Sequence, residues 1–171
     1  MTETLHTGFP PLAAADARVL ILGSMPGSRS LCAQQYYAHP RNTFWDIMEQ
    51  LFGISRALDY PDRVAALVSR RIALWDVLRH CARRGSLDSA IDPASVIHND
   101  FGDFFQYHAG IRAIFFNGQR AAALYRQHVM PELAIPARDL PRLQLPSTSP
   151  AYANADLQQK LATWKQLTAY L

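Results

Sequence analysis

The stretch that decides the fold is RVLILGSMPG, residues 18–27. Its first half is a short run of apolar, mostly branched residues, which is typical of a strand that is buried on both faces. Its second half contains two glycines and a proline, the residues that end strands and form turns. This stretch therefore predicts the first strand of a buried sheet, followed by a loop at the edge of that sheet.

Similar apolar runs recur along the chain, and they predict three further strands at residues 71–76, 111–116 and 140–145. The segments around these runs show helical spacing or helix start signals, and they predict helices at residues 43–53, 61–69, 95–108, 117–129 and 156–171. Residues 82–93 are rich in small and charged side chains and are predicted to form a loop. Strands that alternate with helices favour a parallel sheet covered on both faces. We therefore expect an α/β fold of three layers, α/β/α, around a central, mostly parallel four-stranded sheet, in one domain over residues 1–171.

The composition excludes several classes of protein. The chain of 171 residues is 49% hydrophobic and 18% charged, which is ordinary for a globular domain. The N-terminus has no basic segment followed by an apolar one, and no uncharged run is long enough to span a bilayer, so we expect a cytoplasmic protein without membrane contact. Cys32 and Cys81 are far apart and no Cys-x-x-Cys pair occurs, so we expect free thiols, Cys32 in a loop and Cys81 after a strand, and no metal or cofactor.

The net charge of +3 and the pI near 9.1 permit a polyanionic partner without requiring one. Basic residues adjoin several predicted strands, and they would gather if those loops shared one edge of the fold. The arginines in question are Arg29, Arg41, Arg79, Arg83, Arg84, Arg138 and Arg142.

The loops after the predicted strands mark the region where a ligand should bind. In open parallel sheets, ligands bind outside the carboxyl ends of the strands. All four predicted strands end in polar or glycine-bearing segments, at residues 23–27, 75–76, 117–118 and 146–150. The glycines of the first loop form only a weak phosphate signal, because the loop lacks the Gly-Lys-Ser/Thr ending of a mononucleotide-binding loop.

A second segment, Tyr37-Ala-His-Pro-Arg-Asn42-Thr-Phe-Trp45, follows the first loop directly. Asn42 has two compatible interpretations, the cap of the helix that begins at residue 43 and a polar group of the ligand site. Phe44 and Trp45 are interpreted as core residues. For Asp76, at the end of the second strand, a buried structural carboxylate is the simpler interpretation and an orienting role in the site is the alternative.

Four segments together resemble the uracil-DNA glycosylase superfamily, most closely its hypoxanthine-DNA (deoxyinosine) glycosylase branch and next its mismatch-specific uracil/thymine glycosylases. The segments are Gly23-Ser-Met-Pro-Gly27, Tyr37-Ala-His-Pro-Arg-Asn42-Thr-Phe-Trp45, Phe115-Phe-Asn-Gly118 and Leu145-Pro-Ser-Thr-Ser-Pro150. The resemblance covers nearly the whole chain. It implies an enzyme that hydrolyses the bond between a damaged base and deoxyribose after the base has swung out of duplex DNA.

The resemblance also implies roles for particular residues. The catalytic residue is Asn42, and the base-binding residues are Ser24, Met25, Gly27, Tyr37 and Asn117, of which Tyr37 offers a ring face to the base. The DNA-binding residues are Arg41, Ser147, Ser149, Ala151 and Tyr152, with Ala151 or Tyr152 filling the vacated stack. The partner is damaged double-stranded DNA, no metal or cofactor takes part, and a monomer is expected.

Met25 departs from the wider superfamily, in which an aspartate or asparagine at this position helps to activate water. A thioether cannot orient water with comparable strength. The resemblance to the hypoxanthine branch, which also lacks this group, assigns that task to Asn42, and hypoxanthine precedes uracil as the expected substrate. Two alternatives remain: a DNA-binding homologue without catalysis, and a nucleoside or nucleotide hydrolase of similar topology.

Overall fold

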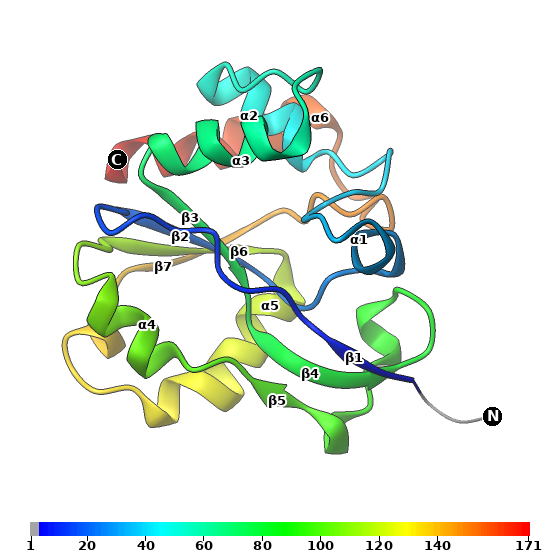
Figure 1. The fold of residues 1–171 in the computed structure, drawn as a ribbon, viewed down its shortest axis with the longest axis vertical. Helices are drawn as coiled ribbons and strands as arrows, with labels where there is room; N and C mark the ends of the chain where they lie inside the picture. Colours follow the sequence, from blue (N-terminus) through cyan, green and yellow to red (C-terminus); the bar gives the residue numbers. More distant parts are fainter. Residues whose placement is uncertain (1–3) are drawn as a thin grey trace.

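The computed structural model describes residues 4–171 and confirms the predicted three-layer α/β/α architecture (Figure 1). The central sheet is four-stranded and parallel, with the spatial order β3-β2-β6-β7. Its strands are β2 (Val19–Gly23), β3 (Ile72–Asp76), β6 (Ala113–Asn117) and β7 (Arg142–Leu145). All four strands lie at the predicted places.

The two faces of this sheet are buried in separate cores. In β2, Leu20 and Leu22 pack into one core, whereas Val19 and Ile21 pack into the other, as expected because successive side chains of a strand point to opposite faces. The helices that cover the second core are α2 (Phe44–Phe52), α3 (Tyr60–Ser69) and α6 (Leu157–Trp164). The helices that cover the first core are α4 (Phe101–Tyr107) and α5 (Gln119–Leu124).

A second, three-stranded antiparallel sheet was not predicted. It consists of β1 (Thr4–Thr7), β4 (Leu78–Arg83) and β5 (Ile97–His98), in the order β1-β4-β5. The prediction of a loop at 82–93 is therefore wrong at its start. The prediction of a helix at 95–108 is wrong over residues 95–100, because α4 begins only after Asp100, whose carboxylate accepts from the backbone N–H of Asp103 at 2.9 Å and caps the helix.

Other helices differ from the prediction in length and type. The helix α5 continues as a π-helix at Tyr125–Val129, and α6 continues as a 3-10 helix at Lys165–Tyr170. A short helix that was not predicted, α1 (Ser28–Ala33), follows the first loop. Short 3-10 turns occur at Asp88–Ala90, Pro93–Ser95, Met130–Glu132 and Ala137–Asp139.

The two cysteines lie elsewhere than predicted: Cys32 is exposed on α1, and Cys81 is buried within β4. Neither forms a disulfide in the described chain. Of the helices within residues 4–171, none is long and apolar enough to cross a membrane.

The order of the strands determines where the sheet opens. The strand β2 lies between β3 and β6, so the chain leaves β2 toward one side of the sheet and later returns to its other side. The loops therefore diverge at the carboxyl ends of β2 and β6, and such a switch point is where parallel sheets bind ligands. Gly23 ends β2 and Asn117 ends β6 at this place.

Candidate active site

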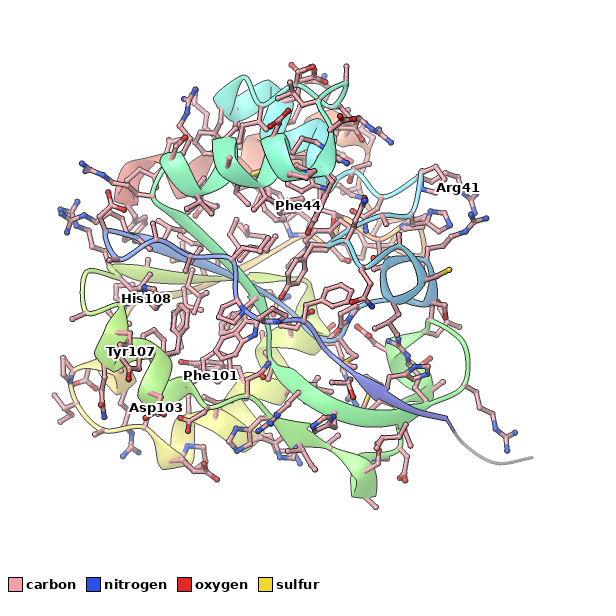
Figure 2. The ribbon with its side chains drawn as sticks, viewed as in Figure 1. Arg41, Phe44, Phe101, Asp103, Tyr107 and His108 are labelled. Carbon is pink, nitrogen blue, oxygen red and sulfur yellow. The ribbon has the colours of Figure 1, made fainter. Side chains whose placement is uncertain are left out.

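A cavity of about 340 Å³ lies at this switch point, a size within the usual range for small-ligand sites. Its lining includes ten of the eleven site residues predicted from the sequence: Ser24, Met25, Gly27, Tyr37, Asn42, Asn117, Ser147, Ser149, Ala151 and Tyr152. The eleventh, Arg41, is exposed on the loop before α2, away from the centre of the molecule (Figure 2). The structure thus brings together residues from four separate segments of the chain.

Asn42 lies one residue before the cap position of α2, which is Thr43, a residue without a side-chain capping bond. The prediction that Asn42 itself is the cap is therefore wrong by one position. Its side-chain oxygen accepts from the backbone N–H of Phe44, the first residue of α2, at 3.0 Å, and the residue lines the cavity. The predictions for Phe44 and Trp45 are confirmed, because both are buried and the indole N–H of Trp45 donates to the Tyr36 carbonyl at 3.1 Å. These two hydrogen bonds fix the chain on both sides of Asn42.

Tyr37 has an unusual backbone conformation, with φ of 55° in the left-handed region. Its ring stacks on Phe44, with centroids 4.2 Å apart and an interplanar angle of 23°, so one ring face is covered. Its hydroxyl is buried and has no partner in good hydrogen-bond geometry within residues 4–171, although the Asn117 amide lies close enough to lower its pKa. Burial, followed by the negative charge of Asp76, raises the pKa of this phenol, so it stays a neutral O–H donor.

Asn117 and Thr148 connect two walls of the cavity. The Asn117 amide donates to the Thr148 hydroxyl at 2.8 Å and accepts from the Thr148 backbone N–H at 2.9 Å. The Thr148 carbonyl accepts from the backbone N–H of Thr43 at 3.0 Å. Thr148 is fully buried. This role of Thr148 was not predicted, because the partners of Thr148 are distant along the chain and local sequence does not reveal them.

The outer part of the same loop presents hydroxyl groups that can still donate a hydrogen bond. The hydroxyls of Ser147 and Ser149 each accept from a backbone N–H two residues later, both at 3.2 Å, and so each keeps its own O–H for another acceptor. Ala151 is exposed. Tyr152 is half-buried, and the Lys160 ammonium lies 5.5 Å from the centre of its ring. Of the two residues predicted to fill a vacated stack, Ala151 is therefore the more accessible.

The loop after β2 is held by a buried charge that the sequence analysis did not assign to the site. The Arg83 side chain, buried beneath the loop, donates to the Pro26 carbonyl at 2.6 Å. Asp88 accepts from the Ser24 hydroxyl at 2.6 Å and lies 3.8 Å from Arg83. Met25 is buried and packs into the core beside Gly8, where a Cβ would lie 3.7 Å from its sulfur.

Asp76 forms part of the cavity wall at the end of β3. Its carboxyl lies against Gly23, where an added Cβ would collide with one carboxyl oxygen, and its other oxygen is buried without a partner among residues 4–171. Burial, followed by the charge of Asp88, raises the pKa of Asp76 to about 8, while Arg83 opposes the rise. At neutral pH the carboxyl is therefore largely protonated. The interpretation of Asp76 as a structural carboxylate did not include this protonation.

Basic residues gather at this edge less than predicted. Arg29 and Arg120 line the cavity, and Arg120 was not among the predicted arginines. Arg138 and Arg142 lie at the opposite end, at and before the start of β7, where the Arg142 guanidinium donates to the Arg138 carbonyl at 2.6 Å. The prediction is wrong for this pair because both residues lie at the amino end of their strand, whereas the cavity lies at the carboxyl ends of the strands. Residues 4–171 contain no cluster of three or more His, Cys, Asp or Glu side chains arranged for a metal ion.

Comparisons with known proteins agree with this geometry. The sequence model described as the Uracil DNA glycosylase superfamily matches residues 10–169. Proteins named hypoxanthine DNA glycosylase from Methanosarcina barkeri and Methanosarcina acetivorans are 34% and 36% identical over 115 and 118 residues, which cover 67% and 68% of this chain and 72% and 73% of those proteins. The solution NMR structure of a candidate uracil DNA glycosylase from Methanosarcina acetivorans superposes with a TM-score of 0.78 at 30% identity, covering 96% of this chain and 99% of that one.

Proposed function

The chain belongs to the uracil-DNA glycosylase superfamily, and from this premise we propose that it is a monofunctional DNA glycosylase that excises deaminated bases, hypoxanthine before uracil, from damaged duplex DNA. The observation that carries the proposal is the cavity at the switch point, which is lined by Asn42 and by the loop after β2. Two similar proteins named hypoxanthine DNA glycosylase support the order of substrates. The chain acts as one domain, as a cytoplasmic monomer.

The reaction needs groups on both sides of the bond that breaks. As the glycosidic bond lengthens, the sugar becomes oxocarbenium-like and negative charge develops on the base. Backbone N–H groups of the loop at residues 24–27 are proposed to donate to the base carbonyl. Asn42 holds the attacking water through the acceptor capacity that remains beside its bond to Phe44. Because a neutral amide is a weak base, the site depends more on stabilising the departing base than on activating water.

The DNA is held at the rim of the cavity. Arg41 and the free O–H groups of Ser147 and Ser149 are proposed to contact phosphates, which fix the position of the duplex without reading its sequence. Ala151 enters the space that the flipped base leaves, since Tyr152 is engaged with Lys160. Asn117 reads the base edge with the amide hydrogen that remains beside its bond to Thr148.

The test uses duplex oligonucleotides with a single deoxyinosine or deoxyuridine, incubated without added metal and then treated with alkali to break the strand at abasic sites. We expect strand breaks with wild type, faster on deoxyinosine, and a loss of about 100-fold or more in Asn42→Ala. Gln106→Ala, which removes an exposed amide on α4, is the matched control.

The outcomes separate the alternatives. One outcome would favour a DNA-binding homologue that has no catalytic activity. In that outcome neither duplex is broken at enzyme excess, and fluorescence anisotropy still shows binding to the duplex. Release of hypoxanthine from free deoxyinosine, at a rate equal to that from the duplex, would favour the nucleoside hydrolase.

A further inference from the structure

We propose that Asp76 is the general acid of this site and that its carboxyl donates a proton to N7 of a 6-oxopurine as the bond to the sugar breaks. The inference rests on the proposed function and gives its leaving group a specific activator. It also assigns the site a substrate class, 6-oxopurines, by a chemical criterion.

The position of Asp76 is the first argument. Its carboxyl is 3% exposed, yet it lines the cavity, and one of its oxygens has no partner in the described chain. Buried polar groups are nearly always hydrogen-bonded, so an unpaired carboxyl in a cavity wall indicates a missing partner. The neighbouring carboxylate of Asp88, by contrast, is occupied by the Ser24 hydroxyl.

The protonation state is the second argument. The titratable groups around Asp76 come from the segment before α2, from α3, from β4 and from the following turn, and they are Tyr36, Tyr37, Tyr60, Arg83 and Asp88. Only Arg83 favours a carboxylate, and it is turned toward Asp88 and the Pro26 carbonyl. Burial and Asp88 prevail, and the pKa of Asp76 rises to about 8. Below that pH the group carries a proton that it can transfer.

The pattern of donors is the third argument. The Tyr37 hydroxyl and one carboxyl oxygen of Asp76 both lie close to Gly23, where an added Cβ would lie 3.2 Å from the hydroxyl and would collide with that oxygen. The other carboxyl oxygen is the one without a partner among residues 4–171. Tyr37 and a protonated Asp76 thus offer two neighbouring O–H groups, which match the O6 and N7 acceptors that lie side by side on hypoxanthine. Adenine offers an amino group in place of O6, and uracil offers a C–H beside its O4. Both are therefore poorer matches.

The proton transfer accounts for every atom. The electron pair of the C1′–N9 bond moves to N9, and the proton of Asp76 moves to N7, so hypoxanthine departs as a neutral N7–H tautomer rather than as an anion. The water held by Asn42 forms the new bond to C1′ and releases its proton to solvent. The Asp76 carboxylate then regains a proton from solvent. The acid thus supplies the leaving-group activation that a neutral amide at position 42 cannot provide.

The experiment compares wild type, Asp76→Asn and the exposed control Asp103→Asn on α4 (Figure 2). Single-turnover cleavage is measured on duplexes that contain deoxyinosine, 7-deazadeoxyinosine, which has a C–H in place of N7, or deoxyuridine. We expect Asp76→Asn to slow deoxyinosine cleavage by about 100-fold, within the usual range for loss of a general acid. Wild type should be slowed by a similar factor on the 7-deaza substrate. Asp76→Asn should cleave both purine substrates at the same rate, and it should slow deoxyinosine cleavage by a larger factor than deoxyuridine cleavage.

The pH profile gives a second readout that a structural role would not produce. The wild-type rate on deoxyinosine should fall above about pH 8, where the carboxyl loses its proton, and the Asp76→Asn rate should not. Equal losses on deoxyinosine and deoxyuridine, or equal wild-type rates on deoxyinosine and its 7-deaza analogue, would overturn the proton transfer while leaving the glycosylase intact. Failure of wild type on every duplex would instead overturn the proposed function and the inference with it.

Discussion

Asn117 and Thr148 hold each other by two hydrogen bonds, of 2.8 and 2.9 Å, between one side-chain amide and the hydroxyl and backbone N–H of the other residue. Because the Thr148 carbonyl also accepts from Thr43, the end of β6, the loop after β7 and the start of α2 form one connected wall. Asn42, Ser147 and Ser149 adjoin this wall in the chain, and Asn117 is part of it.

The first prediction concerns this connection. Thr148→Val keeps the shape of the side chain but removes the hydroxyl that accepts from Asn117. We expect the free energy of unfolding to fall by about 1 to 3 kcal/mol, because a partly buried amide N–H loses its partner. Urea denaturation would measure the change, with the exposed Thr168→Val as control. Equal stability of the two variants would show that the wall does not depend on this hydroxyl.

The second prediction separates the two roles of Asn42. A serine hydroxyl can also accept from the Phe44 backbone N–H but has no amide, so Asn42→Ser should unfold within about 0.5 kcal/mol of wild type, whereas Asn42→Ala should lose about 1 kcal/mol with this hydrogen bond. Both variants should lose deoxyinosine cleavage to the same extent. Recovery of cleavage in Asn42→Ser would mean that the hydrogen bond to Phe44 alone accounts for the importance of this residue.

The third prediction concerns Met25. Asparagine at this position restores a group that orients water, so we expect Met25→Asn to raise the rate of uracil release. The same change places an amide at a core position and should lower the free energy of unfolding by about 1 to 3 kcal/mol. Single-turnover kinetics on deoxyuridine duplexes and urea denaturation measure the two effects. An unchanged or lower rate in folded protein would show that residue 25 does not occupy the water-activating position.

The fourth prediction concerns the DNA contact. Arg41→Ala should weaken binding to every duplex and reduce the slope of log affinity against log salt by about 1, as expected for one lost phosphate contact. Arg112 is also exposed but precedes β6, at the opposite end of the sheet, so Arg112→Ala is the matched control. Fluorescence anisotropy across a salt series measures both slopes, and identical slopes would place Arg41 outside the interface.

The fifth prediction concerns the stability of the fold as a function of pH. The pKa of Asp76 is raised from 3.8 to about 8, so folding favours its protonated form. The resulting stabilisation is complete below pH 3.8 and is lost as the pH rises through about 8. Asp76→Asn does not titrate at this position. As the pH rises between these values, the urea midpoint of wild type should therefore fall relative to the urea midpoint of Asp76→Asn. A constant difference across this range would contradict the raised pKa.

The central sheet could be predicted because each of its strands is a short apolar run that is buried on both faces. The second sheet could not, because β4, Leu-Arg-His-Cys-Ala-Arg, has neither a continuous apolar run nor strict alternation, and it ends in Arg83, a charged residue that sequence reasoning places at the surface. Arg83 is buried beside Asp88 and donates to the Pro26 carbonyl, 57 residues earlier in the chain.

The candidate site, like the fold, could be predicted only in part from the sequence. The loops after the strands and the resemblance of four segments predicted most of the cavity lining. The importance of Thr148 and of the protonated Asp76 could not be predicted, because both depend on neighbours that come together only in the folded chain. Asp76 did stand at a strand end, and this was the one local signal that pointed to it.

The contact between Gly23 and Asp76 restricts the order in which this enzyme can evolve. A side chain at position 23 would collide with the Asp76 carboxyl unless that carboxyl shifted. A smaller residue at position 76 would remove the collision. Substitution of position 76 before position 23 is therefore the easier order, and the reverse order is the harder one.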